Sequence, residues 1–458
     1  MDEQQQKKYV QMTQTPVSRL IPRLALPCII SMLVTAFYNM ADTFFVGMLK
    51  SNAATGAVGV VFSLMAIIQA IGFFFGQGSG NFISRAIGQK NYEESSDMAS
   101  TGFFSALAAG VLICALGLIF LKPLAYLLGS TDTILPYTKA YLRVILLGAP
   151  WMTSSLVLNN QLRFQGSAAY AMVGITVGAV LNIGLDPLLI FVFDLGIAGA
   201  AWATIISQFV SFCLLLVGCG RGGNIRIDFA HLRMKPYYYL WIFKGGLPSL
   251  ARQGLASVAT ICLNQAARPF GDAAIAAQKV GTQIESISYT TAEGFATAVN
   301  AFIAQNFGAR RLDRICRGYW TAVGMIVAWS CFTTVMLVVF PAPLVRVFIQ
   351  KEEVVRTGVS YLRIMGYSQI LMCLEITSSG AFQGLGRPMP PTLAGVIGNA
   401  ARIPMAILLS ATVLGLDGVW WSISISSIAK GLVVFAWFVV VLHRCTRDGD
   451  LGAPRFIR

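Results

Sequence analysis

Long apolar segments recur along the whole chain, and they limit its fold more than any other feature. About twelve of these segments could cross a hydrocarbon core of about 30 Å as helices, which takes about 20 residues each. Only 12% of the residues are charged, against roughly 25% in a soluble domain. The segments are long and continuous rather than short and alternating, which excludes a membrane β-barrel. The sequence therefore predicts an all-α polytopic membrane protein.

Basic residues are distributed unevenly between the connections of the predicted spans. The spans are residues 22–48, 55–82, 98–120, 138–160, 170–193, 197–219, 243–267, 274–304, 318–340, 359–381, 392–413 and 418–442. With the N-terminus inside, the even-numbered connections and both tails are rich in Lys and Arg, and the opposite side is poorer. Because Lys and Arg accumulate in cytoplasmic loops, both termini are expected in the cytoplasm of a multi-pass inner-membrane protein. The same bias explains the formal net charge of +14 without a nucleic-acid partner.

The remaining local signals exclude several classes of protein. The polar stretch 1–23 lacks a small-residue cleavage site, so we expect a retained cytoplasmic tail. The nine cysteines include no C-x-x-C pair, which argues against a disulfide framework and a zinc site. No H-E-x-x-H or G-x-S-x-G constellation is present. The sequence thus indicates neither an enzyme nor a bound cofactor.

Self-similarity at a spacing of about 220 residues indicates an internal duplication. The matching pairs are "LALPCIIS" (24–31) with "GGLPSLAR" (245–252), "NFISRAIGQK" (81–90) with "AFIAQNFGAR" (301–310), "YLRV" (141–144) with "YLRI" (361–364), "RFQGS" (163–167) with "AFQGL" (381–385), and "DLGIAGAAW" (194–202) with "VLGLDGVWW" (413–421). Each repeat holds about six spans, an even number, so the halves are parallel repeats about an axis along the membrane normal. We therefore expect an N-terminal six-helix lobe (1–220), a cytoplasmic lobe linker (221–240) and a C-terminal six-helix lobe (241–458). This organisation is typical of alternating-access transporters.

Two carboxylates break the repeat inside predicted spans. Asp42 lies in "YNMADTFFVG", and Asp186 lies in "VLNIGLDPLLI". The second half has Ile403 opposite Asp186, and an apolar residue near Cys262 or Leu263 opposite Asp42. Both acids are therefore additions to one lobe, which favours a functional role over a purely structural one.

Polar partners of the two acids are predicted at similar depth. A helix rises about 1.5 Å per residue, which puts Asp42, Asp186 and Thr204 roughly 10 Å beneath the outer surface. Asn182 and Tyr38 each precede one of the acids by four residues, and so share its helix face. The five side chains are expected to form one polar cluster.

A carboxylate pair at this depth requires a proton or a cation. Isolated carboxylates are costly within a membrane, and two adjacent ones compete for charge. Hard oxygen ligands suit H⁺ or Na⁺ better than a transition metal. A bound Na⁺ would be held by Asp42, Asn182, Asp186 and Thr204.

The alternative is a structural role, in which each Asp caps a broken helix or hydrogen-bonds a neighbour. Pro187 directly follows Asp186 and disturbs the local backbone bonding, which offers such a role. Pro27 and Pro187 are also the candidates for helix bending.

The second lobe carries charges of both signs at mid-membrane depth. Glu285, Arg402, Arg252 and Lys430 all fall near the middle of their spans. Such residues either pair with one another or line a central cavity. The candidate substrate-cavity residues are Glu285, Gln253, Arg402 and Lys279.

Several motifs together resemble the multidrug and toxic compound extrusion (MATE) family, in the wider group of multidrug, oligosaccharidyl-lipid and polysaccharide exporters. They are "YNMADTFFVG", "NFISRAIGQKNYEES", "LRFQGSAAYAMVGITVGAVLNIGLDPLLIF", "LGIAGAAWAT", "IAQNFGARRLDR" and "FQGLGRP", and the resemblance covers nearly the whole chain. It implies a V-shaped bundle of two six-helix repeats. It also implies export of cationic and amphipathic compounds in exchange for H⁺ or Na⁺.

Within that family the chain is most similar to the DinF-like branch, whose cation site lies in the N-terminal lobe. The residues that this resemblance implies are Tyr38, Asp42, Asn182, Asp186 and Thr204. The NorM branch uses a carboxylate on its seventh span, and "SLARQGLASVATICLNQ" contains none.

The expected function is a secondary active multidrug efflux antiporter with no cofactor beyond its coupling ion. Its expected partners are membrane lipid and small cationic or amphipathic substrates, and the expected oligomeric state is a monomer. The alternative is a lipid-linked oligosaccharide flippase of the same superfamily, which would need a strongly cationic central cavity.

Overall fold

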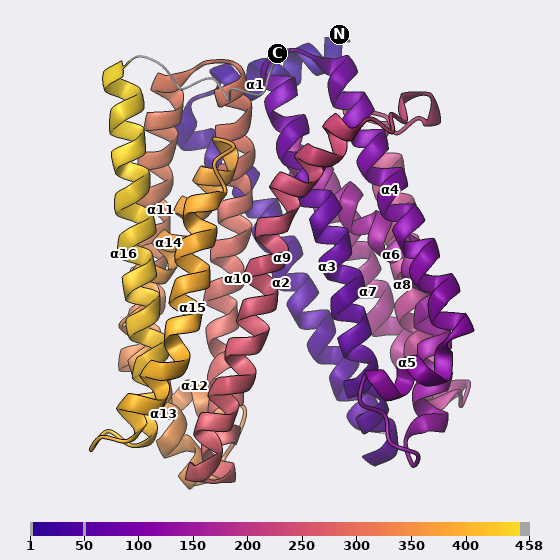
Figure 1. Cartoon of the computed structure of the whole chain (residues 1–458), viewed down its shortest axis with the longest axis vertical. Coiled ribbons are helices and arrows are strands. Elements are labelled where there is room, and N and C mark those ends of the chain that lie inside the picture. Colours follow the sequence, from indigo (N-terminus) through magenta and orange to yellow (C-terminus); the bar gives the residue numbers. More distant parts are fainter. Residues whose placement is uncertain (1–2, 49–51, 449–458) are drawn as a thin grey trace. The chain divides into compact units, whose positions relative to one another are not determined.

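The computed structural model describes residues 3–48 and 52–448, without the side chains of 43, 47, 52–55, 252, 253, 256, 257, 261, 264, 272 and 448. Every regular element in these residues is helical (Figure 1). The α-helices are α1 (Glu3–Gln14), α2 (Val17–Gly47), α3 (Asn52–Gly88), α4 (Tyr92–Ile119), α5 (Leu121–Leu127), α6 (Leu135–Phe164), α7 (Ala168–Pro187), α8 (Gly196–Cys219), α9 (Pro236–Ala267), α10 (Asp272–Gly308), α11 (Leu312–Val339), α12 (Pro341–Arg346), α13 (Glu352–Gly366), α14 (Gln369–Gly384), α15 (Met389–Ser410) and α16 (Leu416–Asp448). Three single turns join them: η1 (Leu188–Val192), η2 (Phe229–His231) and η3 (Arg268–Phe270). The predicted all-α class is confirmed.

Within the described chain, 9 helices are long and apolar enough to cross a membrane. They are α2, α3, α4, α6, α7 with η1, α8, α11, α15 and α16. The three other predicted spans, 243–267, 274–304 and 359–381, fall on α9, α10 and the pair α13 and α14. These three regions carry more polar residues, including Lys279, Glu285 and Glu375. The chain is therefore a multi-pass membrane protein.

The tenth predicted span is interrupted rather than continuous. Helix α13 ends at Gly366, and α14 begins at Gln369. The break leaves backbone carbonyls without their helical partners, and side chains supply donors instead. Thr334 donates its hydroxyl to the Gly366 carbonyl at 3.2 Å, and the Gln369 amide donates to the Met365 carbonyl at 3.3 Å. These bonds offset the cost of breaking the helix inside an apolar region.

The helices form two compact units, which we call unit 1 (Met1–Gln14 and Ile30–Ser249) and unit 2 (Thr15–Ile29 and Leu250–Arg458). The units differ from the expected lobes because the start of α2 counts with unit 2 and the start of α9 counts with unit 1. In unit 2, a Cβ at Gly294 would lie 2.8 Å from the Cα of Ile29, so α2 and α10 are in backbone contact there. In unit 1, Ile242 of α9 is 1% exposed and belongs to a buried cluster with Phe82 and Ile83 of α3.

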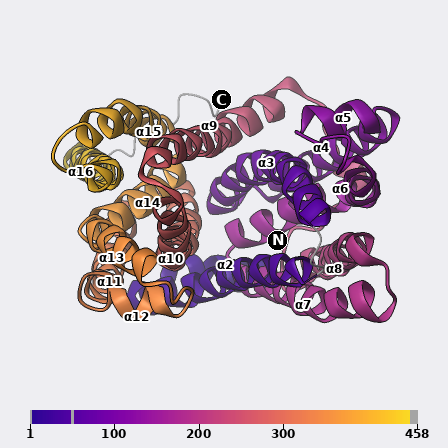
Figure 2. The ribbon, with the colours of Figure 1, turned by 90° about the horizontal axis from the view of Figure 1, so that it is seen from below.

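Each unit is built around one buried helix. In unit 1, α6 contacts α3, α4 and α8, and most of its length is buried. Figure 2 looks along the helices and shows α3, α4 and α6 side by side. In unit 2, α14 contacts α10, α11 and α16, and almost all of its residues are buried. Helices of similar apolar character therefore lie at the centre of a unit where other helices surround them, and at its outside where they do not.

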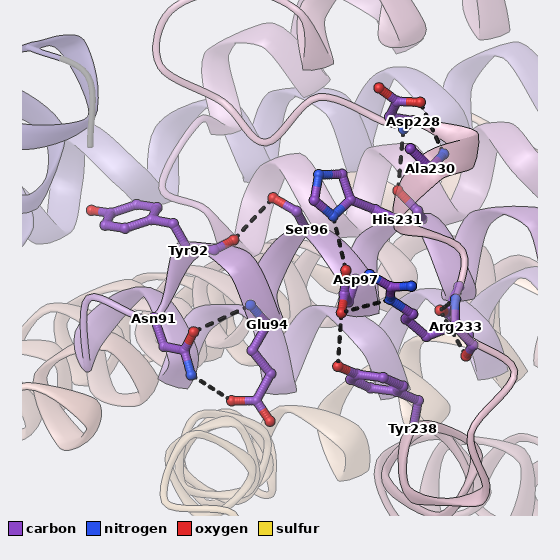
Figure 3. Close-up of polar contacts among 12 residues, drawn as sticks. Asn91, Tyr92, Glu94, Ser96, Asp97, Asp228, Ala230, His231, Arg233 and Tyr238 are labelled. Atoms are coloured by element: carbon purple, nitrogen blue, oxygen red, sulfur yellow. Dashed lines mark hydrogen bonds and ion pairs between the residues drawn. The ribbon is translucent and has the colours of Figure 1, made fainter.

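The segment between α8 and α9 is a fixed part of unit 1, held by one carboxylate (Figure 3). Asp97 of α4 lies 2.8 Å from Nδ1 of His231, and accepts hydrogen bonds from Nε of Arg233 and the hydroxyl of Tyr238, both at 3.3 Å. Thr101, one turn further along α4, bonds to both backbone groups of Arg233. The predicted linker 221–240 is thus fastened to α4 rather than extended.

Candidate functional site

A buried polar cluster lies in unit 1, where three helices meet. Tyr38 and Asp42 come from α2, Asn182 and Asp186 from α7, and Thr204 from α8. Asp186 is 0% exposed, Asn182 1%, Thr204 2% and Tyr38 8%, while Asp42 is half-buried. Asp186 interacts electrostatically with Asp42, and Tyr38 interacts with both acids. The structure therefore brings all five residues together in one unit.

Local sequence explains how each helix presents its side chains. Asn182 and Asp186 are four residues apart and so share one face of α7. Helix α7 ends at Pro187, and the chain continues as the π-turn η1, because proline lacks the amide proton that a regular turn needs. Single π-turns inside helices occur frequently at functional sites. The hydroxyl of Thr204 is held by a 3.0 Å bond to the carbonyl of Ala200, one turn earlier on α8.

Five atoms of this cluster are buried with no hydrogen-bond partner among the residues that the structure describes. They are Oδ1 of Asp42, both side-chain polar atoms of Asn182 and both carboxylate oxygens of Asp186. Buried polar atoms in proteins nearly always have a partner, so a group that supplies charge or hydrogen bonds fits here. A proton or a Na⁺ meets the chemistry of two carboxylates, an amide oxygen and a hydroxyl. Asp186 makes none of the capping bonds that a structural role would use.

A fourth helix adds a phenol that sequence reasoning missed. Tyr141 of α6 is 1% exposed, interacts electrostatically with Asp42 and Asp186, and lies within hydrogen-bonding reach of Thr204. Tyr141 lies in "YLRV", which the second half matches with "YLRI", so the comparison of the two halves does not single it out. The matching tyrosine, Tyr361 of α13, donates its hydroxyl to Glu285 at 3.3 Å. A tyrosine therefore approaches a carboxylate in each unit.

A cavity of about 110 Å³ adjoins the cluster inside unit 1. Tyr38 and Asn182 line it together with Asn39, Gln69 and Phe73. Ligand pockets for drug-sized molecules usually measure about 300–1,000 Å³. This cavity therefore suits an ion, water molecules or one substituent of a larger amphipathic molecule.

The charged residues predicted in the second lobe are held largely by polar neighbours. Glu285 of α10 accepts hydrogen bonds from Tyr361 and from Nε2 of Gln369, both at 3.3 Å. Arg402 of α15 donates to Ser426 and Ser427 of α16 at 3.3 and 3.1 Å, and interacts electrostatically with Glu285.

Lys430 of α16 extends this network. Its ammonium lies 3.2 Å from Oδ1 of Asn399 and 4.0 Å from the carboxylate of Glu375. Of the four candidate substrate-cavity residues, Glu285 and Arg402 come together, and Lys279 is exposed on α10. The fourth, Gln253, has a side chain outside the described residues. Polar neighbours therefore account for Glu285 and Arg402, and an ion pair joins Lys430 to Glu375.

Comparison with known proteins finds the same organisation twice along the chain. A family model described as MatE matches residues 27–188 and again 248–408, two segments about 220 residues apart. The multidrug export protein MepA of Staphylococcus aureus (strain MSSA476) is 27% identical over 439 residues, which cover 95% of this chain and 96% of that protein. The protein of the same name from Staphylococcus saprophyticus is 26% identical over 429 residues, covering 93% and 94%.

Solved structures of similar chains cover nearly the full length. A multidrug resistance MATE family transporter of the MOP superfamily, in an outward-facing conformation, superposes with a TM-score of 0.89 at 25% identity, covering 96% of this chain and 98% of that one. A MOP superfamily transporter from Pyrococcus furiosus Vc1 superposes with a TM-score of 0.88 at 25% identity, covering 96% and 99%.

Proposed function

This chain belongs to the MatE family, whose members are transporters and not enzymes, and we propose that it is a secondary antiporter exporting cationic or amphipathic small molecules in exchange for H⁺ or Na⁺. Its relatives are named multidrug export proteins, which supports this substrate class. The positive charge bias of the connections supports a cytoplasmic membrane location with both termini inside. The protein would act as a monomer, since each chain carries both repeats.

The set of buried, unsatisfied atoms around Asp186 carries the proposal. Two neighbouring carboxylates without counter-charge repel each other strongly in a medium of low dielectric constant. A proton or Na⁺ entering between Asp42 and Asp186 removes that repulsion and draws α2 toward α7 and α8. When the ion leaves, α2 is released from this position.

Coupling follows because the ion changes the position of one helix. Asp42 lies on α2, whose first part belongs to unit 2 and whose remainder belongs to unit 1. Pro27 lies close to that division and permits a bend in α2. Ion binding that favours one packing of α2 therefore favours one conformation of the transporter. This holds only if the ion binds the two conformations with different affinities.

The proposal is tested by transport in proteoliposomes. Vesicles are loaded with a fluorescent cationic dye, and H⁺ and Na⁺ gradients are applied separately to wild type, Asp42→Asn and Asp186→Asn. Asp194→Asn is the matched control, because Asp194 is an exposed aspartate of the same unit. Both cluster variants should lose gradient-driven dye movement, and the control should retain it.

Two outcomes would decide against parts of this proposal. Undiminished gradient-driven transport in both cluster variants would refute the assignment of the coupling site. Movement of lipid-linked sugars, with no response to any dye, would favour the flippase alternative. The ion pair of Lys430 with Glu375 argues against that alternative, because it leaves less positive charge for a phosphate.

A further inference from the structure

Helix α1 packs on a surface of unit 1 that includes Gly166 and Gly223, in two connections between helices. We call this surface the seat of α1. Met12 and Thr13 of α1 are 1% and 2% exposed. Gly166, which follows α6, has φ +79°, and a Cβ there would lie 3.0 Å from the sulfur of Met12. Gly223, which follows α8, has φ +69°, and its Cβ would lie 2.8 Å from the backbone of Gln4. Both connections adopt conformations suited to glycine where α1 approaches.

Polar contacts fasten α1 to the same seat. The ammonium of Lys8 donates to Oδ1 of Asn224, which also accepts a 2.6 Å bond from the hydroxyl of Ser167. Burial lowers the pKa of Lys8 to about 7. Lys90, in the connection between α3 and α4, lies 4.8 Å from the ring centre of Tyr9. Helix α1 thus contacts three connections of unit 1, those between α3 and α4, between α6 and α7, and between α8 and α9.

The seat itself is held in place by the bonds of Figure 3. Asn224 lies at the start of the segment that Asp97 fastens to α4 through His231, Arg233 and Tyr238. Its own amide donates to the carbonyl of Gly218 at 2.8 Å. The surface that receives α1 is therefore part of the packed body of unit 1.

The residue directly after α1 is fixed in the other unit. Thr15 belongs to unit 2, and its carbonyl accepts a 2.8 Å hydrogen bond from the guanidinium of Arg314 on α11. The next turns of α2 are anchored as well, because Leu20 and Ile21 are 0% and 1% exposed. One extended residue spans at most about 3.6 Å. The chain therefore has almost no slack between its attachment to unit 1 and its attachment to unit 2.

We propose that α1 is a strap that limits how far the two units can separate on the face bearing these connections, and that α1 must leave its seat before this face opens. The inference rests on the proposed alternating-access function, which assigns this face to the cytoplasm. The strap precedes residue 27, where the match to the family model begins.

Two variants of the full-length protein separate the strap from a purely structural role. Met12→Glu places a carboxylate in the seat and should speed amide exchange in α1 by about tenfold or more. A flexible six-residue Gly-Ser insert between Gln14 and Thr15 adds about 20 Å of slack and changes no buried side chain. The matched controls are Gln6→Glu, at an exposed position of α1, and the same insert placed before Glu3.

Fluorophores carried by unnatural amino acids at positions 93 and 313, exposed sites in units 1 and 2, report the separation in lipid nanodiscs. Met12→Glu and the insert should both raise the population with the larger separation, and the insert should do so while α1 stays protected from exchange. The controls should match wild type.

An unchanged distance distribution in the insert variant would overturn the strap. If Met12→Glu does not fold, the distance distribution of the insert variant tests the strap by itself. If wild-type vesicles move no dye while the insert still widens the distribution, the antiport proposal fails and the strap stands.

Discussion

Replacing Asp186 by Asn should make the protein more stable while abolishing its coupled transport. Asp186 is fully buried, and neither of its oxygens has a hydrogen-bond partner among the described residues. A buried, unsatisfied polar group costs about 1–3 kcal/mol, and more when it is charged. The neutral amide of Asn removes the charge at constant size. At pH 8 and without Na⁺, we therefore expect the free energy of unfolding to rise by about 1 kcal/mol or more, which is the extra penalty of a charged group over a neutral one.

Asp97 provides the contrasting control in the same unit. It is 7% exposed, but its carboxylate contacts three donor groups, on His231, Arg233 and Tyr238. Hydrogen bonds to charged groups contribute about 1.5–3 kcal/mol, so Asp97→Asn should lower stability by about that amount. The two aspartates thus predict opposite signs for the same substitution.

The assay is unfolding of the purified protein in detergent, followed by tryptophan fluorescence. The same measurement distinguishes the coupling ions. If Na⁺ binds at Asp42 and Asp186, a concentration of 100 times its Kd stabilises wild type by about 2.7 kcal/mol and leaves Asp186→Asn unchanged. If a proton is the ligand, lowering the pH reduces the difference between wild type and variant. A loss of stability in Asp186→Asn comparable to that of Asp97→Asn would refute the reasoning, because it would mean that the carboxylate holds the fold together.

Three further predictions concern other parts of the molecule. Tyr141→Phe removes the hydroxyl beside both carboxylates and should lower gradient-driven efflux by about tenfold, while expression and melting temperature stay unchanged. An unaltered efflux rate would exclude Tyr141 from the site. Docking of α1 should strengthen by up to about tenfold per pH unit above pH 7, because Lys8 in its seat has a pKa of about 7 against 10.5 when released. Below pH 7, Lys8 is protonated in both docked and released α1, so the pH dependence of docking disappears. Amide exchange of α1 measured at each pH should show this dependence in wild type and not in Lys8→Met. An equal slope in both proteins would contradict the prediction. Glu285→Gln should destabilise unit 2 by about 1–3 kcal/mol, because Arg402 loses a nearby negative charge. The double variant with Arg402→Gln should lose less stability than the sum of the two single variants. Additive losses in this double-mutant cycle would mean that the two residues do not interact.

Much of this protein could be predicted from the order of its residues. The membrane class follows from continuous apolar segments, because their length alone meets the thickness of a bilayer. The duplication follows from matched motifs, and the family match repeats at that spacing. Asp42 and Asp186 stood out because each occupies an apolar position of the other half.

Other features depended on contacts between distant residues. Tyr141 shares its local pattern with Tyr361, so nothing in the sequence showed that it lies beside Asp42 and Asp186. The polar N-terminal stretch was expected to be a tail, and its helix α1 rests on glycines more than 150 residues away, at 166 and 223. A local pattern does not reveal such a partner, since the partner's surface exists only in the folded chain.

Hydrophobicity and helix periodicity are local properties of the chain, so they are enough to indicate which segments enter the membrane, how they repeat and which helices carry charge. Packing between distant segments sets which helix lies at the centre of each unit, which unit receives the start of α2 and of α9, and which buried atoms remain without partners among the described residues. Those outcomes depend on close packing, in which each side chain is satisfied or left unsatisfied by residues far away in the sequence.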